Sequence, residues 1–344
     1  MMADGRPILL ATRGSALALA QARQVLSQCR AAFPKLAFDI KILKTTGDKL
    51  QETRPDAGGL PKGLFTRELE VALLKGQADL AVHSLKDLPT ELPAGLILGA
   101  VGKRADVREV LVYRDAEYLS QIAAADVLAE WSPGHSRRRG HSPQASLSTL
   151  PQGWTIATGS PRRQAQIRAL RADLRVVPIR GNVPTRLQKL CDDPEMDALL
   201  LAAAGMERLH FEISASGRLQ GDAVPEGLLA VRLPLEVMLP CVGQGAVGIE
   251  VRQDDGRIGV LCERLNHYNT RQAVEAERTL LRAMGGGCQS PVAAFAEVVG
   301  SRLKMSAVSF LHGAARQAQG AGPLAEPAAL GESLAAQLQG EAAS

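Results

Sequence analysis

Three side chains that can do chemistry stand close together in the stretch Val82–Pro89, namely an imidazole, an ammonium and a carboxylate. The apolar run before them, Asp79–Val82, predicts a short buried strand. Pro89 ends regular structure and favours an extended conformation at the residue before it. Ligands of open α/β sheets bind beyond the carboxyl ends of strands, where this turn would lie. Asp87 is therefore a candidate catalytic carboxylate, although a capping Asp beside a solvated Lys86 explains the same residues.

Arginines recur where predicted strands give way to helices, in the segments Thr12–Ser15, Ser160–Arg163, Arg180–Asn182 and Thr185–Arg186. A cation at a helix amino terminus is locally unfavourable, because that end already carries partial positive charge. A bound anion removes the conflict, since helical N–H groups and guanidinium groups both bind carboxylate or phosphate. We therefore expect a ligand with several carboxylates, and expect the adjacent pair in the second segment to be relieved only when ligand is bound. The alternative for each segment alone is a solvated arginine.

Phosphate recognition has no motif in this chain. There is no GxxxxGK[ST] loop, and Gly243-Gln244-Gly245 lacks the third glycine of a dinucleotide-binding fingerprint. Separated arginines suit spread carboxylates better than one compact pyrophosphate.

Cys288 follows the glycine run Gly285–Gly287. Glycines free the backbone and leave the thiol uncrowded. Reactive cysteines are accessible, whereas buried cysteines behave as inert small hydrophobes. A nucleophile, a covalent anchor and a structural thiol are all compatible with these residues alone.

Strands and helices alternate over most of the chain, which predicts an α/β architecture with mostly parallel sheets and crossover helices. The expected strands are Ile8–Ala11, Phe38–Leu43, Asp79–Val82, Thr155–Ala157, Arg175–Ile179 and Asp197–Ala202. The first helices are expected at residues 16–31 and 64–75. The two groups of strands indicate two α/β units.

The last 75 or so residues predict a small α+β domain. We expect a helix capped by Asn269 or Thr270 and ending at Met284, two strands at Val292–Val299 and Leu303–Phe310, and a helix at Ala328–Leu338. The end of the chain is rich in Gly and Ala and poorly patterned.

Residues 115–152 interrupt the alternation. Their Pro, Gly, Ser and Arg content predicts a dispensable flexible surface loop. Arg137–Arg139 offers an alternative, in which the loop attracts an anionic ligand.

Composition favours an ordinary enzyme of two or three domains. The chain has 344 residues, 46% hydrophobic residues and a net charge of +4, and its 3% aromatic content argues against nucleic-acid stacking platforms. Five cysteines without a CxxC pair indicate reduced thiols. No signal peptide or membrane-spanning apolar stretch is seen, so we expect a cytoplasmic protein that binds neither nucleic acid nor membrane.

Several motifs together resemble the porphobilinogen deaminase family, also called hydroxymethylbilane synthases. They lie in the family's order from Ile8 to Leu338: Ala11–Arg13, Thr46–Asp48, Lys62–Phe65, His83–Pro89, Arg180–Val183, Thr185–Leu187, Val242–Ala246 and Gly286–Cys288. The resemblance implies a monomeric transferase that joins four porphobilinogen molecules head to tail, releasing ammonia, to give the tetrapyrrole hydroxymethylbilane.

The resemblance also implies a fold, a cofactor and site residues. The fold is two lobes like those of periplasmic binding proteins (residues 1–105 with 244–264, and 106–243) and a third domain (265–344). A dipyrromethane cofactor is attached through Cys288, and Asp87 is the catalytic group that stabilises cationic intermediates. The other cofactor-binding residues are Lys86, Asp87, Ser160, Arg162, Arg163 and Arg186. The substrate-binding residues are Arg13, Ser15, Lys62, Arg180, Arg186 and Gln244. No metal is implied.

The chain departs from the family pattern at a few positions. Gly159 and Pro161 stand in the family's Gly-Thr-Ser-Ser-Leu-Arg-Arg motif, Gly58 replaces a second loop lysine, and the carboxyl end is shorter. The rival interpretation is a non-catalytic, two-lobed protein that binds a polycarboxylate. It would not need Cys288 after a glycine run, nor Asp87 beside Lys86.

Overall fold

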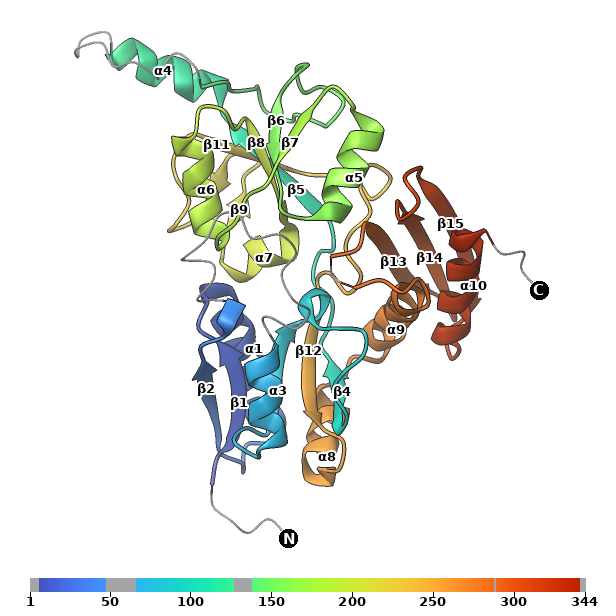
Figure 1. The fold of residues 1–344 in the computed structure, drawn as a ribbon. Coiled ribbons are helices and arrows are strands. Elements are labelled where there is room, and N and C mark those ends of the chain that lie inside the picture. Colours follow the sequence, from blue (N-terminus) through green and yellow to red (C-terminus); the bar gives the residue numbers. More distant parts are fainter. Residues whose placement is uncertain (1–5, 48–65, 127–137, 288, 341–344) are drawn as a thin grey trace. The chain divides into compact units, whose positions relative to one another are not determined.

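The computed structural model describes residues 6–47, 66–126, 138–287 and 289–340 (Figure 1). The chain divides into two compact units, each considered by itself below. Unit 1 comprises Met1–Ala105, Cys241–Ser309 and Arg316–Ser344, and unit 2 comprises Asp106–Pro240 and Phe310–Ala315. The predicted boundaries of three domains stay a prediction. No described helix combines the length and apolar character needed to cross a membrane.

A five-stranded sheet with the order β2-β1-β3-β12-β4 organises the first part of unit 1. Its strands are β1 (Ile8–Arg13), β2 (Phe38–Leu43), β3 (Leu80–Ser84), β4 (Leu96–Val101) and β12 (Val247–Arg252). β1 pairs parallel with β2 and β3, whereas β12 pairs antiparallel with β3 and β4. A late segment of the chain therefore completes the first sheet, beside the strand that leads to Asp87.

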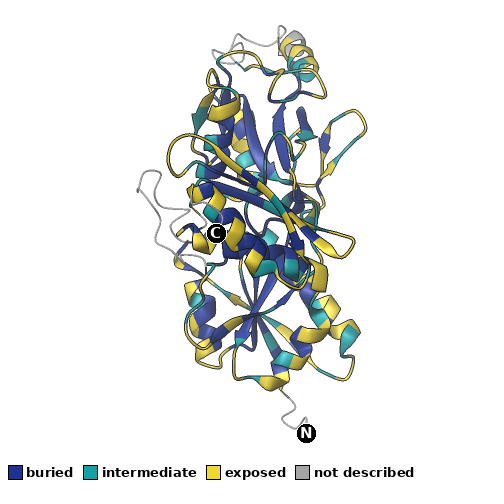
Figure 2. Ribbon diagram, turned by 90° about the vertical axis from the view of Figure 1, so that its right-hand side faces the viewer, coloured by how far each residue is buried: buried dark blue, intermediate teal, exposed yellow. Residues whose placement is uncertain are grey.

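Helices cover both faces of this sheet. They are α1 (Ala16–Ala32), α3 (Arg67–Leu74) and α8 (Gly256–Leu265). α1 and α8 share one apolar cluster with Leu10, Leu80 and Ile249, and α3 packs with Ala11 and Ala81 in another. Adjacent strand residues thus face opposite layers, as expected for a sheet buried on both faces, and Figure 2 shows the strands as predominantly buried.

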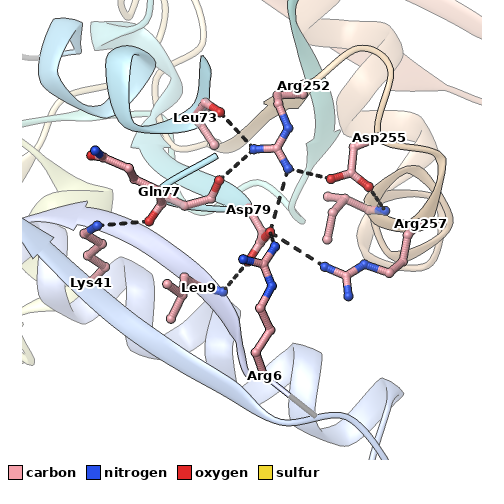
Figure 3. Close-up of polar contacts among 11 residues, drawn as sticks. Arg6, Leu9, Lys41, Leu73, Gln77, Asp79, Arg252, Asp255 and Arg257 are labelled. Carbon is pink, nitrogen blue, oxygen red and sulfur yellow. Dashed lines mark hydrogen bonds and ion pairs between the residues drawn. The ribbon is translucent and has the colours of Figure 1, made fainter. Parts of the chain in front are cut away.

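Buried Asp79 anchors the amino end of β3 (Figure 3). Its carboxylate accepts the backbone N–H of Leu9 at 2.8 Å, and the guanidinium groups of Arg6, Arg252 and Arg257 lie 3.5–3.7 Å from it. The side chain of Asp79 is 3% exposed, so its charge is balanced by these cations within the protein. This network holds β3 against β1 and β12 at the end of the strand opposite Asp87.

The rest of unit 1 is the predicted small α+β domain. A sheet of β13 (Val292–Val299), β14 (Arg302–Ser309) and β15 (Arg316–Pro323) packs against α9 (Tyr268–Ala283) and α10 (Pro327–Gln339). β15 was not predicted, because its Gly- and Ala-rich sequence lacks an apolar alternation. The predicted cap of α9 was wrong: the N-cap is His267, not Asn269 or Thr270, and its side chain accepts the backbone N–H of Thr270.

Unit 2 contains a second five-stranded sheet, with the order β11-β5-β8-β6-β7. The strands are β5 (Glu109–Arg114), β6 (Thr155–Ala157), β7 (Arg175–Val177), β8 (Ala198–Ala202) and β11 (Leu228–Arg232), and a two-residue pair is formed by β9 (Glu212–Ile213) and β10 (Leu219–Gln220). The helices are α4 (Ala116–Asp126), α5 (Pro161–Leu170), α6 (Val183–Asp192) and α7 (Ala203–Arg208). β6 is parallel to β7 and β8, which confirms a second α/β unit with parallel pairing.

The prediction of a flexible surface loop over residues 115–152 was wrong for residues 116–126, which form helix α4, and for residues 138–152. Ala145, Leu147 and Leu150 are buried in the core of unit 2. Arg139 donates to the fully buried carboxylate of Asp197, from Nε at 2.8 Å and from Nη2. Three apolar side chains and one guanidinium hold this segment in place. The high content of Pro, Gly, Ser and Arg hid these contacts from a prediction based on composition. Arg137 lies outside the described residues.

Candidate functional site

The turn that carries Asp87 is a single 3₁₀ turn, η1 (Leu85–Asp87), placed directly after β3. Leu85 donates its N–H to the carbonyl of Ala246 at 3.0 Å, and both Leu85 and Leu88 are buried. Asp87 is exposed between them, and its carboxylate makes no hydrogen bond or ion pair with another residue that the structure describes. Burial of the two leucines therefore holds a free carboxylate outward at the carboxyl end of β3.

Gly243 allows the loop before β12 to pass close to this turn. Its φ of +71° is unfavourable for other residues, and a Cβ there would lie 3.1 Å from Leu85 Cγ. Backbone conformation and the close approach to Leu85 therefore account for the glycine at this position.

A cavity of about 60 Å³ lies in front of the turn. Asp87, Arg13 and Ser15, all predicted site residues, line this cavity. It is also lined by Leu17, Ala18, Gln21, Thr66, Val82, His83 and Ser84. One carboxylate, one guanidinium and several hydroxyl groups therefore converge on a single small space.

Gln21 was missed by the sequence analysis. It lies on the inner face of α1, is 2% exposed, and exchanges hydrogen bonds with the hydroxyl of Ser84 at 2.9 and 3.1 Å. This pairing ties α1, whose first turn Ser15 caps, to the carboxyl end of β3. The available signal was a glutamine among the otherwise apolar residues of the buried face of this helix.

A buried charge cluster lies behind the cavity. His83 Nε2 is 3.0 Å from Glu250 Oε2, and Glu250 is fully buried. Burial raises the pKa of the nearby Glu70 carboxyl, although a hydrogen bond from Thr66 opposes the shift; the negative charge of Glu250 also raises it. The two carboxylates and one imidazole link α3, β3 and β12 beneath the site.

Lys86 and Gln244, the other predicted site residues of unit 1, contact each other. Lys86 Nζ lies 3.5 Å from Gln244 Oε1. Gln244 is 1% exposed, and its backbone carbonyl accepts Arg104 Nε at 2.8 Å. The Gln244 side chain is thus engaged beneath the turn rather than open to the surface.

In unit 2 the positive charges of Arg162 and Arg163 at the start of α5 are balanced, but not in the way predicted. Arg162 Nη2 lies 2.5 Å from Glu109 Oε1, and Arg163 Nη2 lies 2.6 Å from Glu109 Oε2. All three side chains are buried. The expectation that only a bound ligand relieves these cations was therefore wrong, because the anion is supplied by the protein itself at the start of β5.

The pairing leaves one positive charge in this cluster, since two guanidinium groups face one carboxylate. Both guanidinium groups also donate to backbone carbonyls, Arg162 to Leu239 at 2.6 Å and Arg163 to Leu200 at 2.8 Å. These contacts show that the two arginines stabilise the core of unit 2. Sequence reasoning had no means to see Glu109, because it lies more than 50 residues before the arginines.

Two of the remaining predicted residues of unit 2, Ser160 and Arg186, lie at the start of a helix, as expected. Ser160 caps α5 by accepting the N–H of Arg163. Arg186 donates from Nε to the carbonyl of Gly181 at 2.8 Å in the first turn of α6. The guanidinium of Arg180 has no hydrogen-bond or ion-pair partner in the part of the chain that the structure describes. Lys62 and Cys288 lie outside the described residues.

The fold and the site define an α/β protein that presents a carboxylate and a guanidinium at the carboxyl ends of its strands, where open α/β sheets bind their ligands. The described residues contain no group of three or more His, Cys, Asp or Glu placed to hold a metal.

Two family models match the chain. One, described as porphobilinogen deaminase, dipyromethane cofactor binding domain, matches residues 8–259, and the C-terminal domain of the same family matches residues 271–340. A porphobilinogen deaminase of Desulforudis audaxviator is 43% identical over 335 residues, which cover 97% of this chain and 94% of the relative. A porphobilinogen deaminase of Syntrophomonas wolfei is 41% identical over 298 residues, which cover 87% of this chain and 83% of the relative. The chain belongs to the porphobilinogen deaminase family, and its family activity is that of a transferase of tetrapyrrole biosynthesis.

A solved effector-binding domain of BenM with benzoate is similar at a TM-score of 0.40 and 13% identity, covering 75% of this chain and 90% of that one.

Proposed function

We propose that Asp87 is the catalytic group with which this chain polymerises porphobilinogen. The observation that carries the proposal is the exposed Asp87 carboxylate, which faces a cavity lined also by Arg13 and has no partner among the described residues. A carboxylate held in this way can stabilise the positive charge that develops on the substrate as ammonia leaves, and can accept hydrogen bonds from pyrrole N–H groups.

Arg13 and Ser15 are proposed to bind an acidic arm of the substrate. Porphobilinogen carries an acetate and a propionate, and a guanidinium matches a carboxylate by paired N–H donors. Ser15 is the N-cap of α1 and lines the cavity, so the partial positive charge of the helix amino terminus adds to the charge of Arg13. The cavity thus sets a cationic wall against the Asp87 carboxylate, which orients a substrate that is cationic at one end and anionic at the other.

The dipyrromethane cofactor named for this family fits the donor set of the cavity. Its acidic side chains suit Arg13 and its pyrrole N–H groups suit Asp87. When bound, it supplies the pyrrole carbon to which the first substrate unit is joined. We propose that Cys288 holds it covalently and that Lys86, Asp87, Ser160, Arg162, Arg163 and Arg186 contribute to its binding.

The other predicted substrate-binding residues, Lys62, Arg180, Arg186 and Gln244, also remain proposals. Arg180 has the strongest case, because its guanidinium has no partner among the described residues. The monomeric state and the cytoplasmic location expected from the sequence remain predictions.

The test is to incubate the purified full chain with porphobilinogen and measure ammonia and linear tetrapyrrole together. One ammonia released per porphobilinogen consumed supports the proposal. Binding of porphobilinogen without release of ammonia would contradict it and would favour a non-catalytic binding protein.

A further inference from the structure

Helix α9 carries a buried guanidinium that the proposed chemistry does not use. Arg278 is 5% exposed and has no ion pair with a residue in the described ranges. Burial lowers its pKa to about 10, so the side chain is still charged at neutral pH. A buried charge is tolerated only where hydrogen bonds satisfy it. Its partners therefore indicate what the residue does.

Those partners are two consecutive backbone carbonyls next to the catalytic turn. Arg278 Nη1 donates to the carbonyl of Leu88 at 3.1 Å, and Nη2 donates to that of Pro89 at 2.5 Å. Leu88 directly follows Asp87. A guanidinium is a rigid planar fork, so two bonds to successive carbonyls fix both the position and the direction of the segment.

The same face of α9 also packs against the turn. Val274, one helical turn before Arg278, is fully buried and shares an apolar cluster with Leu85 and Leu88. These two leucines flank the polar residues of η1. Helix α9 thus contacts the turn in two ways. Val274 packs against the two leucines, and Arg278 binds the backbone carbonyls that directly follow the turn.

We propose that Arg278 is a positioning residue for Asp87, and this inference rests on the catalytic role proposed for that carboxylate. Asp87 lies on a one-turn element with few backbone hydrogen bonds of its own, so neighbouring groups must fix its place. A displacement of about 1 Å at a catalytic group can cost about a hundredfold in rate. Arg278 prevents such a displacement by holding the two carbonyls that follow Asp87.

The experiment compares kcat and KM of Arg278→Lys and Arg278→Gln with those of the unsubstituted enzyme, at a temperature where all are folded. We expect kcat to fall about tenfold to a hundredfold in Arg278→Gln while KM changes little, since the substrate-binding groups are untouched. Arg278→Lys keeps a cation but loses the fork, and is expected to recover part of kcat.

Two controls separate positioning from general destabilisation. Arg282→Gln alters an exposed arginine one turn further along α9, whose hydrogen bond is to Thr279 of the same helix. Leu334→Ala removes a buried side chain from the core of the small domain, away from the turn. Wild-type kcat in both controls is expected. If Leu334→Ala lowers kcat as much as Arg278→Gln at equal loss of stability, the inference is overturned.

A double-mutant cycle with Asp87→Asn distinguishes this inference from the catalytic proposal. Because Arg278 acts through Asp87, Arg278→Gln is expected to cause no further loss of kcat in the Asp87→Asn background. Additive losses would overturn the positioning role while leaving the role of Asp87 intact. A fully active Asp87→Asn variant would overturn the catalytic role, and the inference with it.

Discussion

Arg163 and Glu109 form a buried ion pair in unit 2, with Nη2 and Oε2 2.6 Å apart. The pair joins the first turn of α5 to the start of β5. Arg162 shares the same carboxylate through its other oxygen. Two arginines that suggested a ligand site from sequence are thus held by the protein's own anion before any ligand binds.

Arg163→Leu is therefore expected to destabilise the protein without cofactor or substrate. The variant loses the donors to Glu109 Oε2 and to the Leu200 carbonyl, and a buried acceptor left without its donor costs about 1–3 kcal/mol, although Arg162 still balances the Glu109 charge. Denaturant unfolding of the cofactor-free protein measures the loss. Arg180→Leu is the matched control, since the Arg180 guanidinium has no partner among the described residues, and it should leave stability unchanged. Equal stability of the two variants would contradict the structural role of Arg163.

Arg139→Gln is expected to destabilise unit 2, because Arg139 donates to the fully buried Asp197. Leaving a buried acceptor short of a donor costs about 1–3 kcal/mol. Thermal or denaturant unfolding gives the value, and Arg138→Gln at the neighbouring position serves as the control. An unchanged Arg139→Gln variant, or an equal loss in both, would restore the view of this segment as a dispensable loop.

Glu70→Gln is expected to change the pH dependence of stability. Burial raises the pKa of Glu70 above the ordinary value of 4.5. A carboxyl whose pKa is raised by folding stabilises the protein below its unfolded pKa, and this contribution is lost as pH rises through the folded pKa. The unfolding free energy of Glu70→Gln minus that of the wild type should therefore increase as pH rises from about 4.5 towards neutrality. A difference that is flat or falls with pH would contradict the raised pKa; the exposed Glu91→Gln is the control.

Cys288→Ala is expected to yield an unmodified and inactive protein, because the thiol is the proposed attachment point of the cofactor. Intact-mass measurement of the wild type should exceed its sequence mass by one dipyrromethane, and that of the variant should not. Cys241→Ala, at a partly exposed thiol, is expected to retain the added mass. Wild-type protein at its bare sequence mass would refute the assignment.

Local pattern predicted most of the α/β framework. The strands Phe38–Leu43, Thr155–Ala157 and Val292–Val299 have the bounds expected from their apolar runs. Strand β15 was missed because its residues carry no alternation and depend on pairing with β14 for their order. Pairing with a neighbouring strand leaves little trace in the sequence of the strand that it orders.

In the candidate site, too, residues with a local sequence signal were predicted and residues that depend on a distant partner were not. Asp87, Arg13 and Ser15 were found because each lies where a strand ends or a helix begins, next to a recognisable local conflict or motif. Gln21 and Glu109 were not found, since each acts through a partner far along the chain. The partners of these two buried side chains become visible only in the folded structure.

The most direct test of the central claim is the turnover of Asp87→Asn. The substitution keeps the shape of the side chain and removes its negative charge, which is proposed to stabilise the positive charge that develops on the substrate as ammonia leaves. Removing one such stabiliser costs about 2.7–4 kcal/mol, a loss of about a hundredfold to a thousandfold in kcat. Ammonia release from porphobilinogen by the variant carrying its full cofactor mass should fall by that factor, while Glu91→Gln keeps wild-type kcat. Near wild-type turnover in Asp87→Asn would show that the carboxylate in the cavity is not the catalytic group.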